Sequence, residues 1–167
     1  MDSAAEVPPT WRVVARQITH PDAAALVTEV QQEYVVRYGS PDETPLDPAY
    51  FEPPQGAFFV GYLDGSPVAT GAWRRRADVV VDGTTATAEI KRMYVAAGAR
   101  RRGLARAMLA HLEATACAAG AEAMVLETGL AQPEAIALYE SAGYAPIPGF
   151  GFYKDAPLAR CFARRLG

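Results

Sequence analysis

The chain has 167 residues, of which 50% are hydrophobic and 21% are charged, and its formal net charge is −3 at pH 7. This composition predicts one soluble globular domain over residues 1–167, without the ~20-residue apolar run of a membrane-spanning helix. The mild negative charge argues against a nucleic-acid-binding protein. Residues 1–10 include Asp2 and Glu6 and do not resemble a signal peptide, so we expect a cytoplasmic protein.

Cysteines and histidines are too few and too scattered to suggest a metal centre. Cys117 and Cys161 are the two cysteines, and His20 and His111 are the two histidines. Because no C-x-x-C spacing or histidine pair accompanies them, we expect two reduced thiols and no metal. Both histidines are expected at surface or helix-cap positions.

The N-terminal segment predicts a strand followed by a helix. Residues 11–18 are rich in β-branched and aromatic side chains, which favours a strand. Thr19 is the expected cap of the helix that follows, and Gly39 is expected to end it. The apolar stripe of this helix consists of Leu26, Val27, Val30 and Tyr34.

Residues 40–56 predict a loop, because their five prolines prevent a long helix or strand. One helical turn is expected near residues 47–51. The loop also carries four carboxylates, at Asp42, Glu43, Asp47 and Glu52. A loop of this length in a compact domain is commonly either functional or mobile.

Residues 57–95 predict an antiparallel meander. Asp64-Gly65 and Asp82-Gly83 are turn signals, and they would join strands at 57–63, 68–74, 78–81 and 85–95. In the last strand, Ile90, Met93 and Val95 break the alternation expected of a half-buried strand. This irregularity predicts either a β-bulge near Lys91 and Arg92 or a strand that is buried on both faces.

An arginine-rich loop lies between this strand and the next helix. The helix is indicated by the apolar stripe Leu104, Met108, Leu109, Leu112 and Ala116, and it should end before Gly120. Four arginines lie at its positive N-terminal end, at Arg100, Arg101, Arg102 and Arg106. Because a helix N-terminus favours anions, this arrangement predicts a phosphate-binding loop; the alternative is a solvated basic helix start.

The C-terminal third predicts further alternation of strands and helices. Residues 123–128 favour a strand, Gln132-Pro133-Glu134 opens a helix, and Gly143 closes it. A strand interrupted by prolines and glycines is expected from Tyr144 onward, and residues 158–166 favour a final strand.

The segment Arg100-Arg101-Arg102-Gly103-Leu104-Ala105 resembles the R/Q-x-x-G-x-G/A signature of the GNAT superfamily of N-acetyltransferases. The strand Glu89–Val95 precedes it, and residues 135–144 resemble the family's A-x-x-L-Y-x-x-x-G-F/Y ending. The resemblance covers about residues 57–144. It implies an α+β (mixed α/β) fold, in which a twisted, mostly antiparallel sheet with a splayed central strand carries helices on both faces.

The resemblance also implies a binding site for acetyl-CoA. In the family, backbone amides of the signature loop hold the pyrophosphate, and the pantetheine arm pairs with the bulged strand. The implied cofactor-binding residues are Met93, Tyr94, Val95, Arg100, Arg101, Arg102, Gly103, Leu104, Ala105, Arg106 and Gln132. Many relatives have asparagine at the position of Gln132 and glycine at the position of Ala105.

Two candidate catalytic residues follow from the resemblance. Tyr139 matches the family tyrosine that faces the thioester sulfur, and a phenol of pKa ~10 can protonate a leaving thiolate; the alternative is a core tyrosine. Glu89 matches the catalytic glutamate of some GNAT histone acetyltransferases. Glu127 or ordered water are competing bases, and Glu89 could instead be a solvent-facing strand residue.

The predicted function is transfer of an acetyl group from acetyl-CoA to a primary amine by direct attack on the thioester; the alternative is a catalytically silent acyl-CoA sensor or partner-binding module. The acceptor is expected to be a small-molecule amine or a lysine side chain. The four carboxylates of residues 40–56 favour a cationic acceptor, whereas Arg74, Arg75 and Arg76 favour a carboxylate-bearing amino acid. No nucleic acid or membrane partner is expected, and a homodimer is left open.

Overall fold

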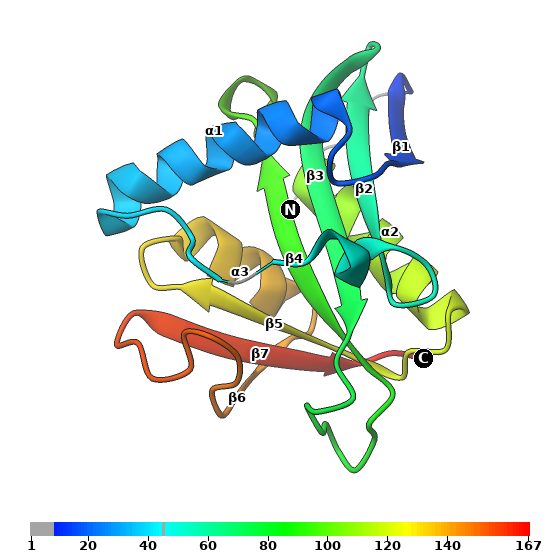
Figure 1. Cartoon of the computed structure of the whole chain (residues 1–167), viewed down its shortest axis with the longest axis vertical. Helices are drawn as coiled ribbons and strands as arrows, with labels where there is room; N and C mark the ends of the chain where they lie inside the picture. Colours follow the sequence, from blue (N-terminus) through cyan, green and yellow to red (C-terminus); the bar gives the residue numbers. More distant parts are fainter. Residues whose placement is uncertain (1–8, 45) are drawn as a thin grey trace, which may run out of the picture.

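The structure is a computed structural model that describes residues 9–44 and 46–167. The expectations for residues 1–8, and the proline at position 45, lie outside the described residues. Seven strands form one sheet in the order β1-β2-β3-β4-β5-β7-β6 (Figure 1). All neighbouring strands are antiparallel except β4 and β5, which are parallel. The chain therefore has the mixed α+β fold with a mostly antiparallel sheet that the sequence predicts.

Strands and helices are interspersed along the chain. The strands are β1 (Trp11–Ala15), β2 (Gly56–Leu63), β3 (Ser66–Arg75), β4 (Thr87–Val95), β5 (Ala123–Gly129), β6 (Ala145–Ile147) and β7 (Ala159–Arg165). The helices are α1 (Pro21–Tyr38), α2 (Leu104–Ala118) and α3 (Pro133–Ser141), with short 3-10 turns η1 (Pro48–Phe51) and η2 (Ala97–Ala99).

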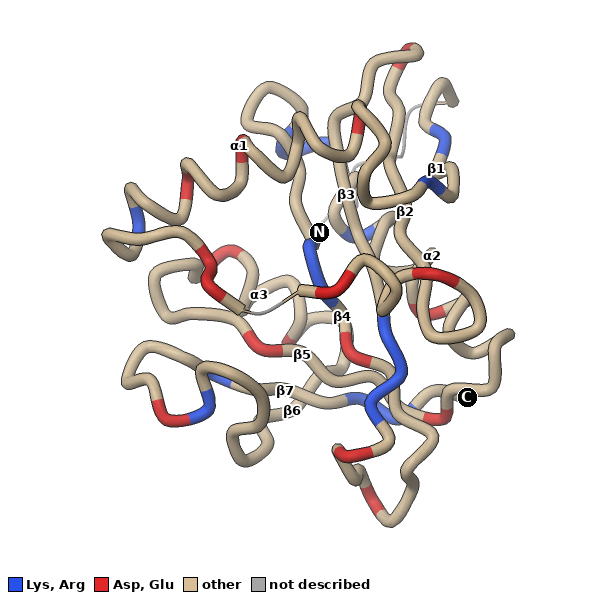
Figure 2. The backbone as a smooth tube through the Cα atoms, in the orientation of Figure 1, with Lys and Arg blue, Asp and Glu red and all other residues tan. Residues whose placement is uncertain are grey.

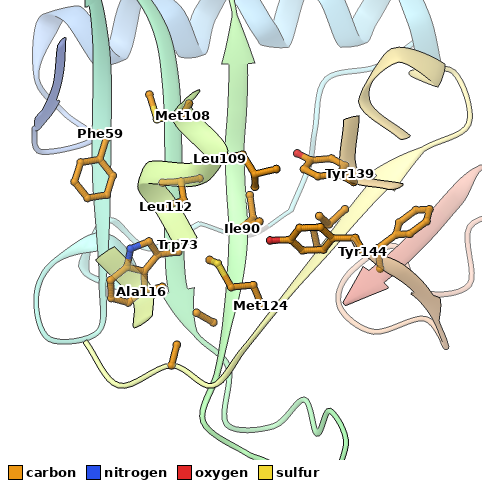
Figure 3. Packing of buried hydrophobic residues seen from close by; sticks show 14 of the residues in the cluster. Phe59, Trp73, Ile90, Met108, Leu109, Leu112, Ala116, Met124, Tyr139 and Tyr144 are labelled. Carbon is orange, nitrogen blue, oxygen red and sulfur yellow. The ribbon is translucent and has the colours of Figure 1, made fainter. Parts of the chain in front are cut away.

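Helices cover both faces of the sheet because successive strand side chains point to opposite sides. Phe58 of β2 packs in one buried cluster with Ala23 and Leu26 of α1. Its neighbour Phe59 belongs to a second cluster that includes Met108 of α2 (Figure 3). The cluster on the α2 side also contains side chains of α3.

The stripe predicted for α2 forms the centre of the larger core. Leu104, Met108, Leu109, Leu112 and Ala116 are all buried. Burial of each large side chain contributes about 1.5–3 kcal/mol. Helix and sheet approach closely where β3 has Gly71, since a Cβ there would lie 2.7 Å from Met108 Cγ.

Three local expectations need correction. Helix α1 is capped by His20, whose Nδ1 accepts a hydrogen bond from the backbone N–H of Asp22 at 3.1 Å, and not by Thr19. The reason is Pro21, which occupies the first helical turn and makes the residue before it the cap. The strand expected at residues 78–81 is reduced to the single bridge between Val81 and Thr84, and β1 ends at Ala15.

The irregularity in β4 is a β-bulge, as one of the two sequence alternatives predicts. Thr70 of β3 pairs with Tyr94, and Ala72 pairs with Lys91, so two residues of β4 lie opposite one residue of β3. Arg92 takes the positive φ of 55° at the bulge. The Thr70 hydroxyl donates a 2.6 Å hydrogen bond to the carbonyl oxygen of Arg92 and fixes the bulged backbone.

Strands β4 and β5 diverge after Glu89 of β4 and Val125 of β5. Their parallel pairing covers residues 87–89 of β4 and 123–125 of β5. From Leu126 onward β5 continues to pair with β7, on its other edge, as far as Gly129. The central strand β4 is therefore splayed away from β5, although both strands belong to the same sheet (Figure 1).

Candidate active site

A cavity of about 360 Å³ lies where β4 and β5 diverge. Residues 90–93 of β4 and 126–129 of β5 form two of its walls. The other walls come from the start of α3, the last turns of α1, residues 40–42, 44 and 46, the loop at residues 153–158 and the first residue of β7. The splayed strands thus open a site that is reached from several parts of the chain.

Tyr139 of α3 lines this cavity. Its side chain is buried, and its ring packs edge-on against Tyr144 with the centroids 5.8 Å apart. In Figure 3 the phenol extends towards β4 with its hydroxyl leading. Burial, with a smaller contribution from Tyr34, raises the pKa of Tyr139, so the hydroxyl carries its proton at neutral pH.

Of the two acidic candidates, Glu127 lines the cavity and Glu89 does not. Burial raises the pKa of Glu127, whose Oε2 lies 3.8 Å from Cys161 Sγ. Glu89 is 2% exposed and forms a 2.6 Å ion pair with Arg76 and a 3.4 Å one with Lys91. The alternative of a solvent-facing Glu89 is therefore wrong, because the carboxylate is buried against Arg76.

The arginine loop connects the end of β4 to the N-terminus of α2. Arg101 and Gly103 adopt positive φ values of 65° and 76°, and Gly103 provides no side-chain cap. The first hydrogen bond of the helix runs from the N–H of Ala107 to the carbonyl of Gly103 at 3.1 Å. The N–H groups of residues 104–106 precede that first bond, which is the usual geometry for an anion at a helix N-terminus.

The loop arginines differ in their contacts. Arg100 donates from Nη2 to Glu33 at 2.7 Å and from Nε to the Val95 carbonyl at 2.9 Å. Arg106 donates to Ser141 Oγ at 2.7 Å. Arg101 and Arg102 are exposed. The positive charge of Arg100, one of the four arginines predicted to attract an anion, is thus balanced by Glu33 of α1.

The remaining candidates divide between the cavity and its surroundings. Met93 and Gln132 line the cavity, and Gln132 Oε1 accepts a 3.3 Å hydrogen bond from the Tyr38 hydroxyl. Tyr94 is directed elsewhere, since its hydroxyl donates to Glu29 at 3.2 Å. The structure thus brings Met93, Gln132 and Tyr139 together and leaves the signature loop beyond the end of β4.

The residues expected to select the acceptor are mostly outside the cavity. Among the four carboxylates of residues 40–56, Asp42 lines it, and Glu43, Asp47 and Glu52 do not. The three arginines of residues 74–76 also lie elsewhere: Arg74 stacks on Tyr50, Arg75 donates to backbone carbonyls, and Arg76 pairs with Asp78 and Glu89.

Sequence patterns did not single out several residues that line the cavity. They include Tyr38 and Tyr153, whereas Tyr34 was noted only as part of a helix stripe and Lys91 only for the predicted bulge. The irregular spacing of apolar residues in β4 predicted a bulge near Arg92. Because a bulge changes the direction of the side chain at that position, it can turn the side chain towards a site. That signal could have identified Arg92 as a site residue. The tyrosines carry no such local signal, because their place depends on how distant segments pack.

The described part of the chain contains no cluster of three or more histidine, cysteine or acidic side chains that could hold a metal ion. His111 packs edge-on against Phe59 at 4.5 Å rather than lying on the surface. Cys117 is exposed and Cys161 is buried, and both are free thiols. Within residues 9–44 and 46–167, no helix has the length and apolarity needed to cross a membrane.

Comparison with known proteins decides the family. Residues 25–144 match the acetyltransferase (GNAT) family. The chain belongs to this family. It is 33% identical over 147 residues to an IAA acetyltransferase of Azospirillum brasilense, a match that covers 87% of this chain and 92% of that protein.

Solved structures of GNAT acetyltransferases share the fold. A provisionally assigned acyl-CoA N-acyltransferase of Klebsiella pneumoniae subsp. pneumoniae is 26% identical with a TM-score of 0.72, covering 94% of this chain and 98% of that one. A GNAT-family acetyltransferase of Staphylococcus aureus Mu50 is 15% identical with a TM-score of 0.71, covering 94% and 99%. This GNAT protein is therefore an acetyltransferase with the acyl-CoA N-acyltransferase fold.

Proposed function

We propose that this GNAT acetyltransferase transfers the acetyl group of acetyl-CoA to a primary amine by direct attack of the amine on the thioester. The observation that carries the proposal is the cavity between the diverging strands β4 and β5, which contains both the Tyr139 phenol and the Glu127 carboxylate. A donor, an acceptor and two proton-transfer groups can meet there within one cavity.

The chain provides a fitting site for the two ends of the donor. Beyond residue 89, the edge of β4 that faces β5 no longer follows the parallel register, and an extended pantetheine arm can pair with this strand near Met93. The pyrophosphate would lie at the N–H groups of residues 102–106, with Arg101 and Arg102 close by. Gln132 would contact the arm from the start of α3.

Tyr139 is the proposed acid. As the amine attacks, the bond between the carbonyl carbon and sulfur breaks, and the departing thiolate takes a proton from the Tyr139 hydroxyl. Burial raises the pKa of this phenol, which keeps it protonated at neutral pH but makes it a weaker acid. The same burial disfavours a charged thiolate and so favours transfer of the proton to sulfur. The packing of the Tyr139 ring against Tyr144 fixes the direction of the hydroxyl.

Glu127 is the proposed base, in preference to Glu89. An alkyl ammonium has a pKa of ~10.4 and must lose a proton before it can attack. Burial raises the pKa of Glu127 and makes its carboxylate a better proton acceptor, directly or through water. Glu89, in contrast, already accepts from Arg76 at 2.6 Å outside the cavity.

The alternative is an acyl-CoA sensor that binds the donor without turnover. Incubation with acetyl-CoA and a panel of primary amines, including lysine peptides, distinguishes the two when free thiol is measured over time. Amine-dependent thiol release with a matching acetylated product supports the enzyme. Tight CoA binding without release for any amine would favour the sensor.

A further inference from the structure

Arg92 lines the cavity, but its guanidinium is incompletely paired. The side chain is 8% exposed, and Nε and Nη1 have no hydrogen-bond partner among the residues that the structure describes. Its ion-pair partner Asp42 places Oδ2 3.6 Å from Nη1, which is beyond hydrogen-bonding distance. Because buried charged donors are costly without acceptors, an additional anion at this position would be stabilised.

The local backbone holds Arg92 in this unusual position. The residue is non-glycine with a φ of 55°, a conformation that persists only where surrounding contacts enforce it. Here the Thr70 hydroxyl bonds its carbonyl oxygen at 2.6 Å. The bulge therefore aims the arginine, which is always charged, at a fixed part of the site.

Asp42 is also held in place and stays just beyond hydrogen-bonding distance of Arg92. Its Oδ1 accepts hydrogen bonds from the N–H of Thr44 at 2.9 Å and from the Thr44 hydroxyl at 2.6 Å. Although burial opposes ionisation, these bonds and the charge of Arg92 lower the pKa of Asp42. Asp42 is thus a carboxylate that attracts the guanidinium without satisfying its Nε and Nη1 donors.

The rest of the cavity is largely apolar and aromatic. Side chains that form this lining include Tyr34, Tyr38, Leu46, Leu126, Tyr153 and Leu158. The second cation, Lys91, lies 3.4 Å from Glu89. In Figure 2 the middle of β4 carries a short basic segment. The guanidinium group of Arg92 has the geometry to bind a carboxylate, and the apolar walls of the cavity suit the hydrophobic part of a ligand.

We propose that Arg92 binds a carboxylate of the acceptor, so that the preferred acceptors are amines carrying both a carboxylate and an apolar body. This inference rests on the proposed acetyl transfer in the same cavity. The CoA phosphates belong elsewhere: at ~3.3 Å per residue, the end of β4 at Val95 already lies roughly 10 Å along the strand from Arg92, and the arginine loop begins beyond it.

The test compares matched amines that differ by the carboxylate. Suitable pairs are phenylalanine with phenethylamine, and 4-(aminomethyl)benzoate with benzylamine, each measured as kcat/KM for thiol release. In at least one pair we expect the wild type to prefer the acid by roughly 10- to 100-fold, the range for a charge-assisted hydrogen bond. Equal use of both members in both pairs would overturn the proposal.

Arg92→Met keeps the length of the side chain and removes its charge. We expect it to abolish the preference for the acid, to leave the carboxylate-free amine within about threefold of wild type, and to leave CoA affinity unchanged. Arg12→Met is the matched control, since Arg12 is exposed on β1 at the edge of the sheet. An equal loss for both members of a pair would show that Arg92 is structural.

Calorimetric binding of N-acetylphenylalanine and N-acetylphenethylamine separates this proposal from the proposed function. Tighter binding of the acid by the wild type but not by Arg92→Met supports the carboxylate site, even if no amine turns over and acetyl transfer fails. Turnover of amines without any advantage for the acid, in rate or in binding, leaves acetyl transfer standing and overturns the role of Arg92.

Discussion

The buried ion pair between Arg76 and Glu89 makes a prediction that separates a structural glutamate from a catalytic one. Arg76 is 11% exposed and Glu89 is 2% exposed, with 2.6 Å between Nη1 and Oε1. Removal of Arg76 leaves the buried Glu89 carboxylate with only its longer, 3.4 Å ion pair to Lys91. We expect Arg76→Met to reduce the free energy of unfolding by about 3–5 kcal/mol, the cost typical of breaking such a pair.

The double variant Arg76→Met/Glu89→Met should recover most of this loss, because a hydrophobic replacement of both partners removes the stranded carboxylate. Arg165→Met is the matched control: its pair with Glu122 is 3.8 Å long with both side chains about half exposed, so it should cost no more than about 1 kcal/mol.

Urea unfolding followed by tryptophan fluorescence measures these differences, since Trp73 is 4% exposed in the main core. In thermal unfolding, the single variant should melt roughly 6–20 °C lower, at ~2–4 °C per kcal/mol for a domain of this size. Glu89→Gln should keep thiol release per folded molecule within about threefold of wild type. A ~10²-fold or larger loss of turnover without loss of stability would restore Glu89 as the catalytic base.

Three further predictions concern the base, the anion loop and the core. Glu127→Gln should lower kcat/KM by ~10²–10⁴-fold and remove the acidic limb of the pH profile of kcat/KM. The reason is that the Glu127 carboxylate acts as a base above its raised pKa and becomes protonated as the pH falls through that pKa. An unchanged pH profile would leave water or Glu89 as the base. Arg102→Glu should weaken CoA binding by roughly 2- to 30-fold, which corresponds to twice the ~0.2–1 kcal/mol of an exposed ion pair, and the effect should be larger at low salt. The control Arg12→Glu should leave CoA affinity unchanged. Equal CoA affinities of Arg102→Glu and the wild type would remove Arg102 from the site. Gly71→Ala should cost about 1–3 kcal/mol in urea unfolding, because its Cβ would lie 2.7 Å from Met108 Cγ; an unchanged midpoint would mean that α2 shifts freely.

The parts of the fold that depend on local periodicity were predictable from the sequence. The stripe from Leu104 to Ala116 predicted α2, and every member of it is buried. The odd spacing between Ile90 and Met93 predicted the bulge that the structure places at Arg92. Both features are properties of a short stretch of chain, so neighbouring residues suffice to specify them.

The state of individual side chains at the site was not predictable in the same way. Glu89 of β4 pairs with Arg76, the residue after β3, and no local pattern reports this contact between residues 13 positions apart. The cavity tyrosines Tyr38 and Tyr153 come from opposite ends of the chain and meet only through tertiary packing. The expected cytoplasmic location, the single-domain organisation and the assembly state stay predictions.

The most direct test of the cavity as the catalytic site is the rate of thiol release by Tyr139→Phe. Tyr144→Phe is the matched control, because Tyr144 is also buried but donates its hydroxyl to Glu113 at 2.9 Å, outside the cavity. Both variants should keep the fold and CoA affinity, and kcat should fall by ~10²-fold or more for Tyr139→Phe only. Wild-type turnover by Tyr139→Phe would contradict the account and make Tyr139 a core residue.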